Sequence, residues 1–272
     1  MPSSRYYKFK EVNREERIKK LKSLFLFFGI FCLFIGIIWT IFLSPTFKIK
    51  NVDIISDCVY LGSNDIKKII SDIAPLGLKE NLLVVSNSRL KSELAAMFPA
   101  ITDISVKKKL FNTITVNYKK RIQVGIWCNS VNCYYFDKEG IIFADAPRTE
   151  GGLILKITNL SKNDISLGGK VLDDNRIHFI IDFIDSVGKI DKFKILEFKI
   201  KPSPSVDFEA VTDAGWLIYL DDNQEPTSAV NNLLTILDEA VKNTGNLEYI
   251  DLRIPSRIYY CFEGKPCAAS AR

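Results

Sequence analysis

The segment Ser23–Leu43 reads SLFLFFGIFCLFIGIIWTIFL and carries no charged side chain. At a rise of about 1.5 Å per residue, a helix of this length spans roughly 30 Å, the thickness of the hydrocarbon layer of a bilayer. A soluble helix of this length without a polar face would be unusual. Trp39 lies near the end of the segment, where an indole suits the membrane interface. The sequence therefore predicts one transmembrane helix over residues 23–43.

The charges on the two sides of this segment are unequal. Residues 1–22 hold eight basic and three acidic side chains, whereas Lys48 and Lys50 are the basic residues that follow closely. Short flanks rich in Lys and Arg stay in the cytoplasm. Residues 1–22 are therefore predicted to be a cytoplasmic basic tail and the bulk of the chain to be extracytoplasmic. The eight basic residues are Arg5, Lys8, Lys10, Arg14, Arg17, Lys19, Lys20 and Lys22.

Two other interpretations of this region are less favoured. A cleaved signal peptide would have a shorter apolar region and a small-x-small site, but Trp39–Pro45 reads WTIFLSP and offers none. A nucleic-acid-binding arm would not be expected directly before an apolar segment. The tail also accounts for the whole net charge of +5, since the remaining residues carry 29 basic and 29 acidic side chains. This balance argues against a nucleic-acid-binding body.

Residues 47–122 are predicted to form a compact α+β module. Alternating apolar and polar residues indicate half-buried strands, and apolar residues at helical spacing indicate two helices between the first and second strands. Phe111-Asn112 reads as a tight turn between the last two strands. The expected order is therefore strand, helix, helix, strand, strand. The elements are Phe47–Ile55, Asn64–Ile73, Arg89–Phe98, Ile101–Leu110 and Thr113–Ile122.

Residues 123–263 are predicted to form a second domain that is mostly antiparallel β with two helices, and residues 264–272 a C-terminal tail. Asp137–Gly140 and Thr212–Gly215 read as hairpin turns with glycine where a positive φ is needed. The expected helices are Asn175–Val187 and Thr227–Lys242. The expected strands are Val124–Cys128, Cys133–Phe136, Ile141–Ala144, Leu153–Ile157, Phe193–Ile200, Val206–Val211, Trp216–Leu220, Tyr249–Leu252 and Arg257–Phe262.

The sequence lacks the usual signatures of catalysis. Its single histidine, His178, lies in a helical pattern, where a packed helix residue is more common than a base or a metal ligand. No HExxH, GxSxG, Walker or GxGxxG pattern occurs. The acidic pairs at Asp173 and Asp221 occupy turns and read as solvated loop charge. We therefore expect no catalytic, cofactor-binding or metal-binding residues.

Five cysteines lie outside the membrane segment and one, Cys32, lies inside it. Cys128 and Cys133 flank a four-residue loop between two strand-like segments, so a disulfide across a hairpin is geometrically reasonable. Cys261 and Cys267 are similarly close in the sequence. Because no histidine lies near these cysteines, disulfides or free thiols are favoured over zinc.

Six segments, each mainly a strand with a turn, follow one another along the chain in a specific order and spacing. They are Phe47–Ile55, Asn81-Leu82, Phe98–Lys107, Thr113–Trp127, Phe136–Phe143 and Tyr249–Arg253. Their order and spacing resemble the FtsQ/DivIB family of bitopic bacterial cell-division proteins, and the resemblance covers roughly residues 1–263. The chain departs from the family pattern at Lys119-Lys120-Arg121 in place of Glu-Arg, at Gln123 in place of proline, and at Pro255-Ser256-Arg257 in a turn that often holds glycine.

This resemblance implies a POTRA domain over residues 47–122 followed by a β domain. It also implies a non-enzymatic scaffold at the division septum, held in the inner or plasma membrane by a single span. The implied partners are other divisome members, above all the small coiled-coil proteins FtsB and FtsL. No cofactor, metal or nucleic acid is implied.

Partners of the family add a strand to a sheet edge near the C-terminal strand, where unpaired backbone groups are available. The candidate edge here is Arg253–Phe262, although Ile258 and Tyr260 also fit an ordinary half-buried strand. The expected partner-binding residues are Arg253, Ile254, Arg257, Tyr259, Tyr260 and Phe262. If binding lies elsewhere, the first module is the alternative.

Two other functional classes remain as alternatives. One is an envelope transport or assembly component, because POTRA modules also occur in outer-membrane machinery, usually in tandem and with a barrel. The other is a membrane-anchored envelope enzyme, against which the scarcity of histidine argues.

Overall fold

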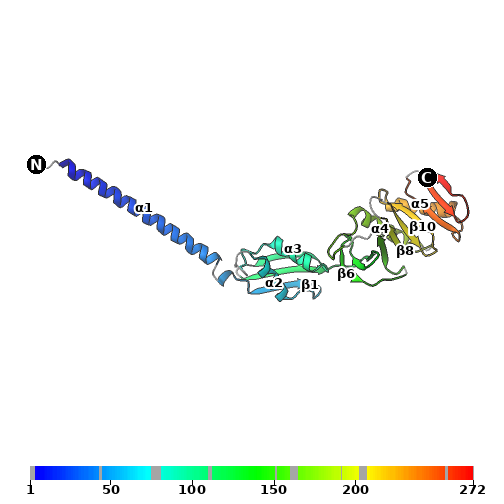
Figure 1. The fold of residues 1–272 in the computed structure, drawn as a ribbon, viewed down its shortest axis with the longest axis horizontal. Helices are drawn as coiled ribbons and strands as arrows, with labels where there is room; N and C mark the ends of the chain where they lie inside the picture. Colours follow the sequence, from blue (N-terminus) through cyan, green and yellow to red (C-terminus); the bar gives the residue numbers. More distant parts are fainter. Residues whose placement is uncertain are drawn as a thin grey trace. The chain divides into compact units, whose positions relative to one another are not determined.

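The structure is a computed structural model that describes residues 4–42, 45–74, 81–109, 112–150, 152–159, 165–190, 192–201, 207–254 and 257–271. Within these residues it is a mixed α+β protein with five α-helices. The first helix, α1 (Ser4–Phe42), includes most of the predicted basic tail as well as the apolar segment (Figure 1). It is the one described helix that is long and apolar enough to cross a membrane, and its apolar side chains are exposed.

The chain divides into two compact units, one of residues 1–94 and 103–118 and the other of residues 95–102 and 119–272. After α1 and a short 3-10 helix (Pro45–Phe47), the elements of the first unit follow the predicted order of strand, two helices and two strands. They are β1 (Asn51–Ser56), α2 (Ser63–Ile73), α3 (Asn87–Met97), β2 (Ile101–Lys109) and β3 (Thr113–Lys120). The three strands form a sheet in the order β1-β3-β2, in which β1 and β3 are parallel.

The core of the first unit lies between the helices and one face of this sheet. Four isoleucines of α2 are buried because they recur at helical spacing, and alternate residues of β3 are buried because successive side chains of a strand point to opposite faces. The backbone N–H of Gly62 donates to Asp65 Oδ2 at 2.9 Å and fixes the start of α2. The Tyr118 hydroxyl donates to Cys58 O at 3.0 Å and holds the loop before α2.

The second unit is built on a ten-stranded sheet with the order β13-β12-β11-β10-β9-β8-β7-β4-β5-β6. Most neighbouring strands are antiparallel, and the parallel pairs are β4–β7, β7–β8 and β10–β11. The strands are β4 (Gly125–Cys128), β5 (Cys133–Phe136), β6 (Ile142–Ala146), β7 (Leu155–Asn159), β8 (Ile195–Ile200), β9 (Asp207–Thr212), β10 (Leu217–Asp221), β11 (Leu247–Asp251), β12 (Arg257–Phe262) and β13 (Ala268–Ala271). The predicted mixed, mostly antiparallel sheet with two helices is therefore present.

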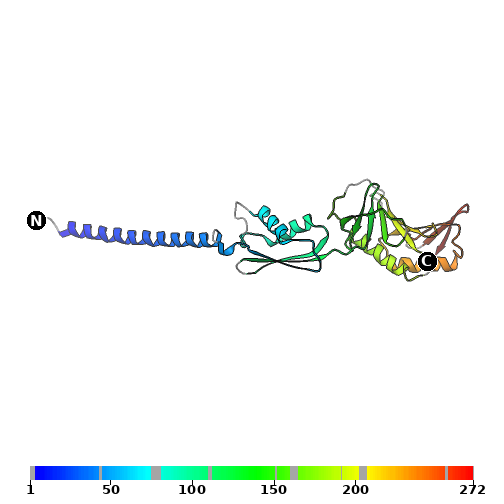
Figure 2. The ribbon, with the colours of Figure 1, turned by 90° about the horizontal axis from the view of Figure 1, so that it is seen from below.

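Two helices connect parallel strands of this sheet and pack beside each other on one of its faces (Figure 2). α4 (Asp174–Val187) joins β7 to β8, and α5 (Pro226–Glu239) joins β10 to β11. Parallel neighbours need such crossovers, which bring a helix back over the sheet. Asp173 caps α4 by accepting from the Arg176 N–H at 2.9 Å.

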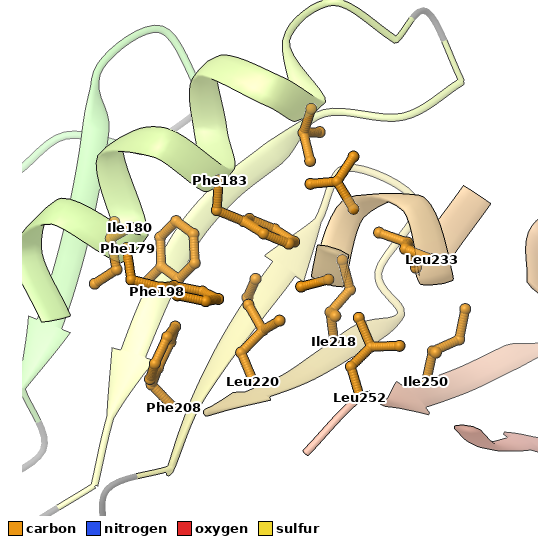
Figure 3. Close-up of a cluster of buried hydrophobic side chains, with 14 of the residues drawn as sticks. Phe179, Ile180, Phe183, Phe198, Phe208, Ile218, Leu220, Leu233, Ile250 and Leu252 are labelled. Atoms are coloured by element: carbon orange, nitrogen blue, oxygen red, sulfur yellow. The ribbon is translucent and has the colours of Figure 1, made fainter. Parts of the chain in front are cut away.

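The main core lies between these two helices and the sheet (Figure 3). Phe179 and Phe183 of α4 point toward Phe198 and Phe208 of the sheet, and the rings of Phe179 and Phe208 meet edge to face at 5.5 Å. Leu233 of α5 lies over the neighbouring part of the sheet. Burial of several large aromatic and aliphatic side chains in one layer supplies most of the driving force for this unit.

The turns and the C-terminus show where local sequence decided the fold and where it did not. Gly140 and Gly215 have φ values of 72° and 88°, as the predicted hairpin turns require. Residues 264–272 were expected to be a tail, but Ala268–Ala271 forms β13. The predicted turn at Pro255-Ser256 and the last residue of the predicted span, Leu43, lie outside the described residues.

Candidate protein-interaction site

The residues expected to bind a partner lie on β12 and on the loop before it. β12 pairs with β11 on one side and with β13 on the other, in the registers Ile250↔Tyr260 and Tyr260↔Ala268. The prediction that Arg253–Phe262 forms the edge of the sheet is therefore wrong. The reason is that the chain turns back after β12, with Gly264 at a φ of 70°, and adds one more strand.

The side chains of β12 divide between the two faces of the sheet. Tyr260 and Phe262 pack against the main core next to the buried Ile258, and the two rings meet edge to face at 6.0 Å. Arg257 and Tyr259 occupy the alternate positions and therefore belong to the outer face, which is the face opposite α4 and α5. Of the expected aromatic anchors, Tyr259 is thus the one placed for contact with a partner.

Arg253 is held by the protein's own carboxylates. Its Nη1 lies 2.6 Å from Asp207 Oδ2, and its Nη2 and Nε lie 2.6 Å and 2.9 Å from the two carboxylate oxygens of Asp251. The hydrogen bonds that Arg253 donates to Asp251, and then those to Asp207, raise the pKa of Arg253 above its ordinary value although burial opposes the rise. Arg253 therefore fastens the loop after β11 to β9. Its neighbour Ile254 is exposed.

Next to Arg253 the outer face carries a cluster that the sequence did not predict. Two cations lie near the Tyr219 ring, with Arg253 Cζ 5.1 Å and Lys201 Nζ 5.8 Å from its centroid. The ring of Tyr249 lies 5.0 Å from that of Tyr219, and its hydroxyl lies 3.6 Å from Cys267 Sγ. We call Lys201, Tyr219, Tyr249 and Arg253 the aromatic–basic cluster. At Tyr249 the cluster comes close to Cys267, which directly precedes β13.

The structure joins both of the expected cysteine pairs. Cys128 and Cys133 are directly opposite each other on β4 and β5, with Cα atoms 4.1 Å apart. Cys261 on β12 bonds to Cys267 just before β13, with Cα atoms 4.3 Å apart. Such short separations are typical of the non-hydrogen-bonded pairs of an antiparallel ladder. The second disulfide therefore fixes the register of β13 on β12.

No group of three or more metal-ligating side chains lies together in the part of the chain that the structure describes. A hollow of about 530 Å³ beyond the end of α4 is lined on its polar side by Lys189, Lys192, Lys194 and Asp213, without a histidine or cysteine. His178 is exposed on α4, not packed. What this unit presents instead is the free side of β13, which ends the described sheet next to the aromatic–basic cluster.

Within the described residues, these features define a class of protein: a chain with one helix of membrane-spanning length and two mixed α+β units, the second of which has β13 at the edge of its sheet. A scan of the sequence against models of known protein families gives no match. The chain is similar to the cell division protein DivIB of Clostridium acetobutylicum, with 25% identity over 154 residues. That match covers 56% of this chain and 59% of the length of the relative.

Proposed function

We propose that this chain is a non-enzymatic scaffold of the bacterial division machinery that α1 anchors in the cell membrane. Three observations support the proposal: the membrane-length helix, the POTRA-like order of elements in the first unit and the similarity to a DivIB protein. In this proposal the N-terminal tail is cytoplasmic, and both units lie outside the cell membrane at the division septum. The partners are FtsB/FtsL-like bitopic proteins and other divisome members.

The partner binds, in this proposal, by adding a strand to the free side of β13. The observation that carries this step is the geometry at Cys267. Because Cys261 and Cys267 form a non-hydrogen-bonded pair, Ala269, two residues further along β13, also belongs to such a pair with Tyr259. The N–H and C=O of Ala269 then point away from β12 and toward an incoming strand.

Side chains on the outer face beside this edge determine, in this proposal, which partner binds. Arg257 and Tyr259 lie on β12 next to the alanines of β13, whose small side chains leave them accessible. Exposed Ile254 adds an apolar contact. Tyrosine and arginine are typical residues of binding hot spots. Arg253, Tyr260 and Phe262 serve the fold in this proposal, because ion pairs or core contacts already engage them.

The variant Ala269→Pro tests the proposal. Proline deletes the outward-pointing donor of Ala269 but leaves the β12–β13 ladder, and edge strands tolerate it. We expect partner capture by the full-length chain in detergent to fall about tenfold, as the loss of one backbone hydrogen bond implies. Ala269→Val is the matched control, because it changes the same side chain and keeps the N–H. Circular dichroism checks that both variants fold.

Two results would contradict the proposal in different ways. Normal capture by Ala269→Pro together with stronger capture after deletion of residues 264–272 would show that the partner replaces β13 on β12. If Ala269→Pro and the deletion of residues 264–272 both left partner capture unchanged, the interface would have to lie on another surface, such as the first unit. A fluorescent fusion to the N-terminal tail tests the role itself, because a division scaffold gathers at midcell and an assembly component or enzyme of the envelope is spread over the membrane.

A further inference from the structure

The residues after the apolar segment are neutral in sum, but their charge is unevenly distributed between the two parts of the chain. Residues 45–120 carry twelve basic and seven acidic side chains, a net charge of +5. Residues 121–272 carry 17 basic and 22 acidic side chains, a net charge of −5. The part that directly follows the membrane-length helix is therefore the basic one. Clusters of lysine close to a membrane attract anionic lipids.

Part of this charge surrounds a hollow on the outer face of the three-stranded sheet, opposite α2 and α3. The hollow has a volume of about 300 Å³. Lys107 and Lys109 are both exposed. Lys109 pairs with Asp53 at 2.9 Å, whereas Lys107 has no ion-pair partner among the described residues. The lining residues are Ile55, Ser105, Lys107, Lys108, Lys109, Thr115 and Asn117.

Thr115, one of the lining residues, has a buried hydroxyl that lacks a partner within the described part of the chain. Thr115 lies on the central strand β3, is 7% exposed, and its Oγ1 has no hydrogen-bond partner among the described residues. A buried hydroxyl without a partner is costly, so proteins usually satisfy it. Because Oγ1 is itself buried, a ligand oxygen in the hollow would accept its hydrogen bond once the side chain turns about χ1 toward the hollow. The same oxygen would be attracted by the free ammonium group of Lys107.

The chain connects this end of the sheet closely to α1. Only residues 43–50 separate α1 from β1, and eight residues reach at most about 28 Å. The backbone N–H groups of Lys50 and Asn51 both donate to Asn112 O, at 2.8 Å and 3.2 Å. Asn112 directly precedes β3, so the chain joins the sheet at the end that carries Lys109. The basic hollow is therefore tethered within reach of lipid headgroups.

We propose that this hollow binds the phosphate of an anionic phospholipid headgroup. Non-bridging phosphate oxygens accept hydrogen bonds from Lys107 Nζ and Thr115 Oγ1, and Asn117 adds a side-chain amide. Ile55, a residue that is 55% exposed, provides an apolar contact for the glycerol part of the lipid. The site fixes the first unit against the outer surface of the membrane. This inference requires that α1 crosses a membrane but does not depend on a role in division.

Lysine footprinting of the full-length chain in nanodiscs tests the proposal. Acetylation rates are measured by mass spectrometry in discs of phosphatidylcholine alone and in discs that also contain phosphatidylglycerol. With the anionic lipid, we expect Lys107 to be acetylated roughly tenfold more slowly, as attraction of two lysines to an anionic surface implies. Lys67 and Lys68, which lie on α2 over the other face of the sheet, should react equally fast in both.

Two substitutions separate the site from general electrostatic attraction. Thr115→Val keeps the shape of the side chain but removes the hydroxyl, and it should abolish most of the protection of Lys107. Lys109→Gln should weaken that protection, whereas Lys68→Gln, which makes the same change of charge elsewhere in the unit, should not. Lys109→Gln also serves if Thr115→Val fails to fold.

Three outcomes would overturn the proposal. Equal rates for Lys107 in both kinds of disc would exclude a lipid. Equal slowing at Lys67 and Lys68 would show attraction of the whole unit without a site. Protection of Lys107 that appears only after an acidic partner protein is added, regardless of the lipid, would show that the hollow binds protein.

Discussion

Two arginines within the family-like segments hold loops to the second unit. Arg121 donates to Pro99 O at 3.0 Å and pairs with the buried carboxylate of Asp137. Arg253 makes the corresponding connection to Asp207 and Asp251. Of the two, Arg253 was expected from the sequence to bind a partner. The contacts of Arg121 and Arg253 with these carboxylates indicate that both arginines stabilise the fold.

Replacing Arg253 with alanine should therefore destabilise the second unit. The change leaves buried Asp251 without its charged donor, which costs about 1–3 kcal/mol. Urea unfolding can be followed by the fluorescence of Trp127 and Trp216, both buried in this unit. Arg257→Ala, at an exposed position, is the control and should change the free energy of unfolding by less than about 0.5 kcal/mol. Equal effects of the two substitutions would contradict this role for Arg253.

Glu197 should make the second unit sensitive to acid. Burial raises the pKa of Glu197, but hydrogen bonds from Thr158 and Lys156 and the charges of Lys156 and Lys199 together hold the pKa below its ordinary value of 4.5. A carboxyl with a lowered pKa stabilises the fold above its unfolded value and loses this contribution as the pH falls through its folded value. Stability should thus decline below about pH 4.5.

Glu197→Gln checks this prediction, because the amide does not titrate. The free energy of unfolding of the variant should fall less steeply than that of the natural protein between about pH 6 and about pH 3. Glu248→Gln, at an exposed position on β11, is the control. Identical slopes for the natural protein and Glu197→Gln would show that this carboxyl does not contribute.

At the scale of the elements, the sequence predicted what depends on local pattern. Helices with apolar residues at helical spacing, such as α2 and α4, and strands with alternating residues lie within a few residues of their expected positions. Phe47 is an exception, because it ends a short 3-10 helix and β1 begins only at Asn51. Glycine-containing turns were also predictable, since a positive φ favours glycine.

The missed elements depend on pairing across the chain. Ala268–Ala271 has no β-branched or aromatic residue, so its strand forms because β12 offers a partner. The signal that could have revealed it was the spacing of Cys261 and Cys267 around Gly264, which is typical of a hairpin. The aromatic–basic cluster could not be predicted, because Tyr219 and Tyr249 meet only when β10 and β11 pair in parallel across α5.

The two disulfides should exist in protein taken from the cell envelope. Mass spectrometry without reduction should find Cys128 linked to Cys133 and Cys261 linked to Cys267. Each closes a short loop, so its removal should cost about 2 kcal/mol at most. Cys261→Ser with Cys267→Ser should also speed amide exchange in β13, whereas Cys128→Ser with Cys133→Ser should not. Free, alkylatable thiols at all four positions would contradict the prediction.

At the scale of the whole molecule, charge varies along the chain in a regular way. A basic tail precedes the apolar segment, a basic unit follows it, and the acidic residues are concentrated after residue 121. This order suits a chain whose tail remains in the cytoplasm and whose acidic part is farthest along the chain from the membrane. The positive charge after the apolar segment lies mostly within a folded unit, so it does not compete with the tail as a topology signal.

Fusions to alkaline phosphatase, which is active only after export, test this orientation. A fusion after Leu61 should be active and a fusion before Lys22 inactive. Replacing the eight basic residues of the tail with neutral ones should reduce the activity of the first fusion, because the charge difference that directs insertion is lost. Activity of the tail fusion alone would reverse the proposed topology.

The bond between Cys261 and Cys267 also has a mechanical consequence. If a partner binds along β13 as proposed, any pulling force on it reaches the last strand of the sheet. An edge strand loaded at its end unzips one residue at a time, which takes little force. Here the separation of β13 from β12 stops at Cys267, after only the four residues of β13 have come away. The force then passes through the disulfide into β12, which is paired with β11 along its other side. The covalent link thus limits how far the second unit can unravel under a pulling force.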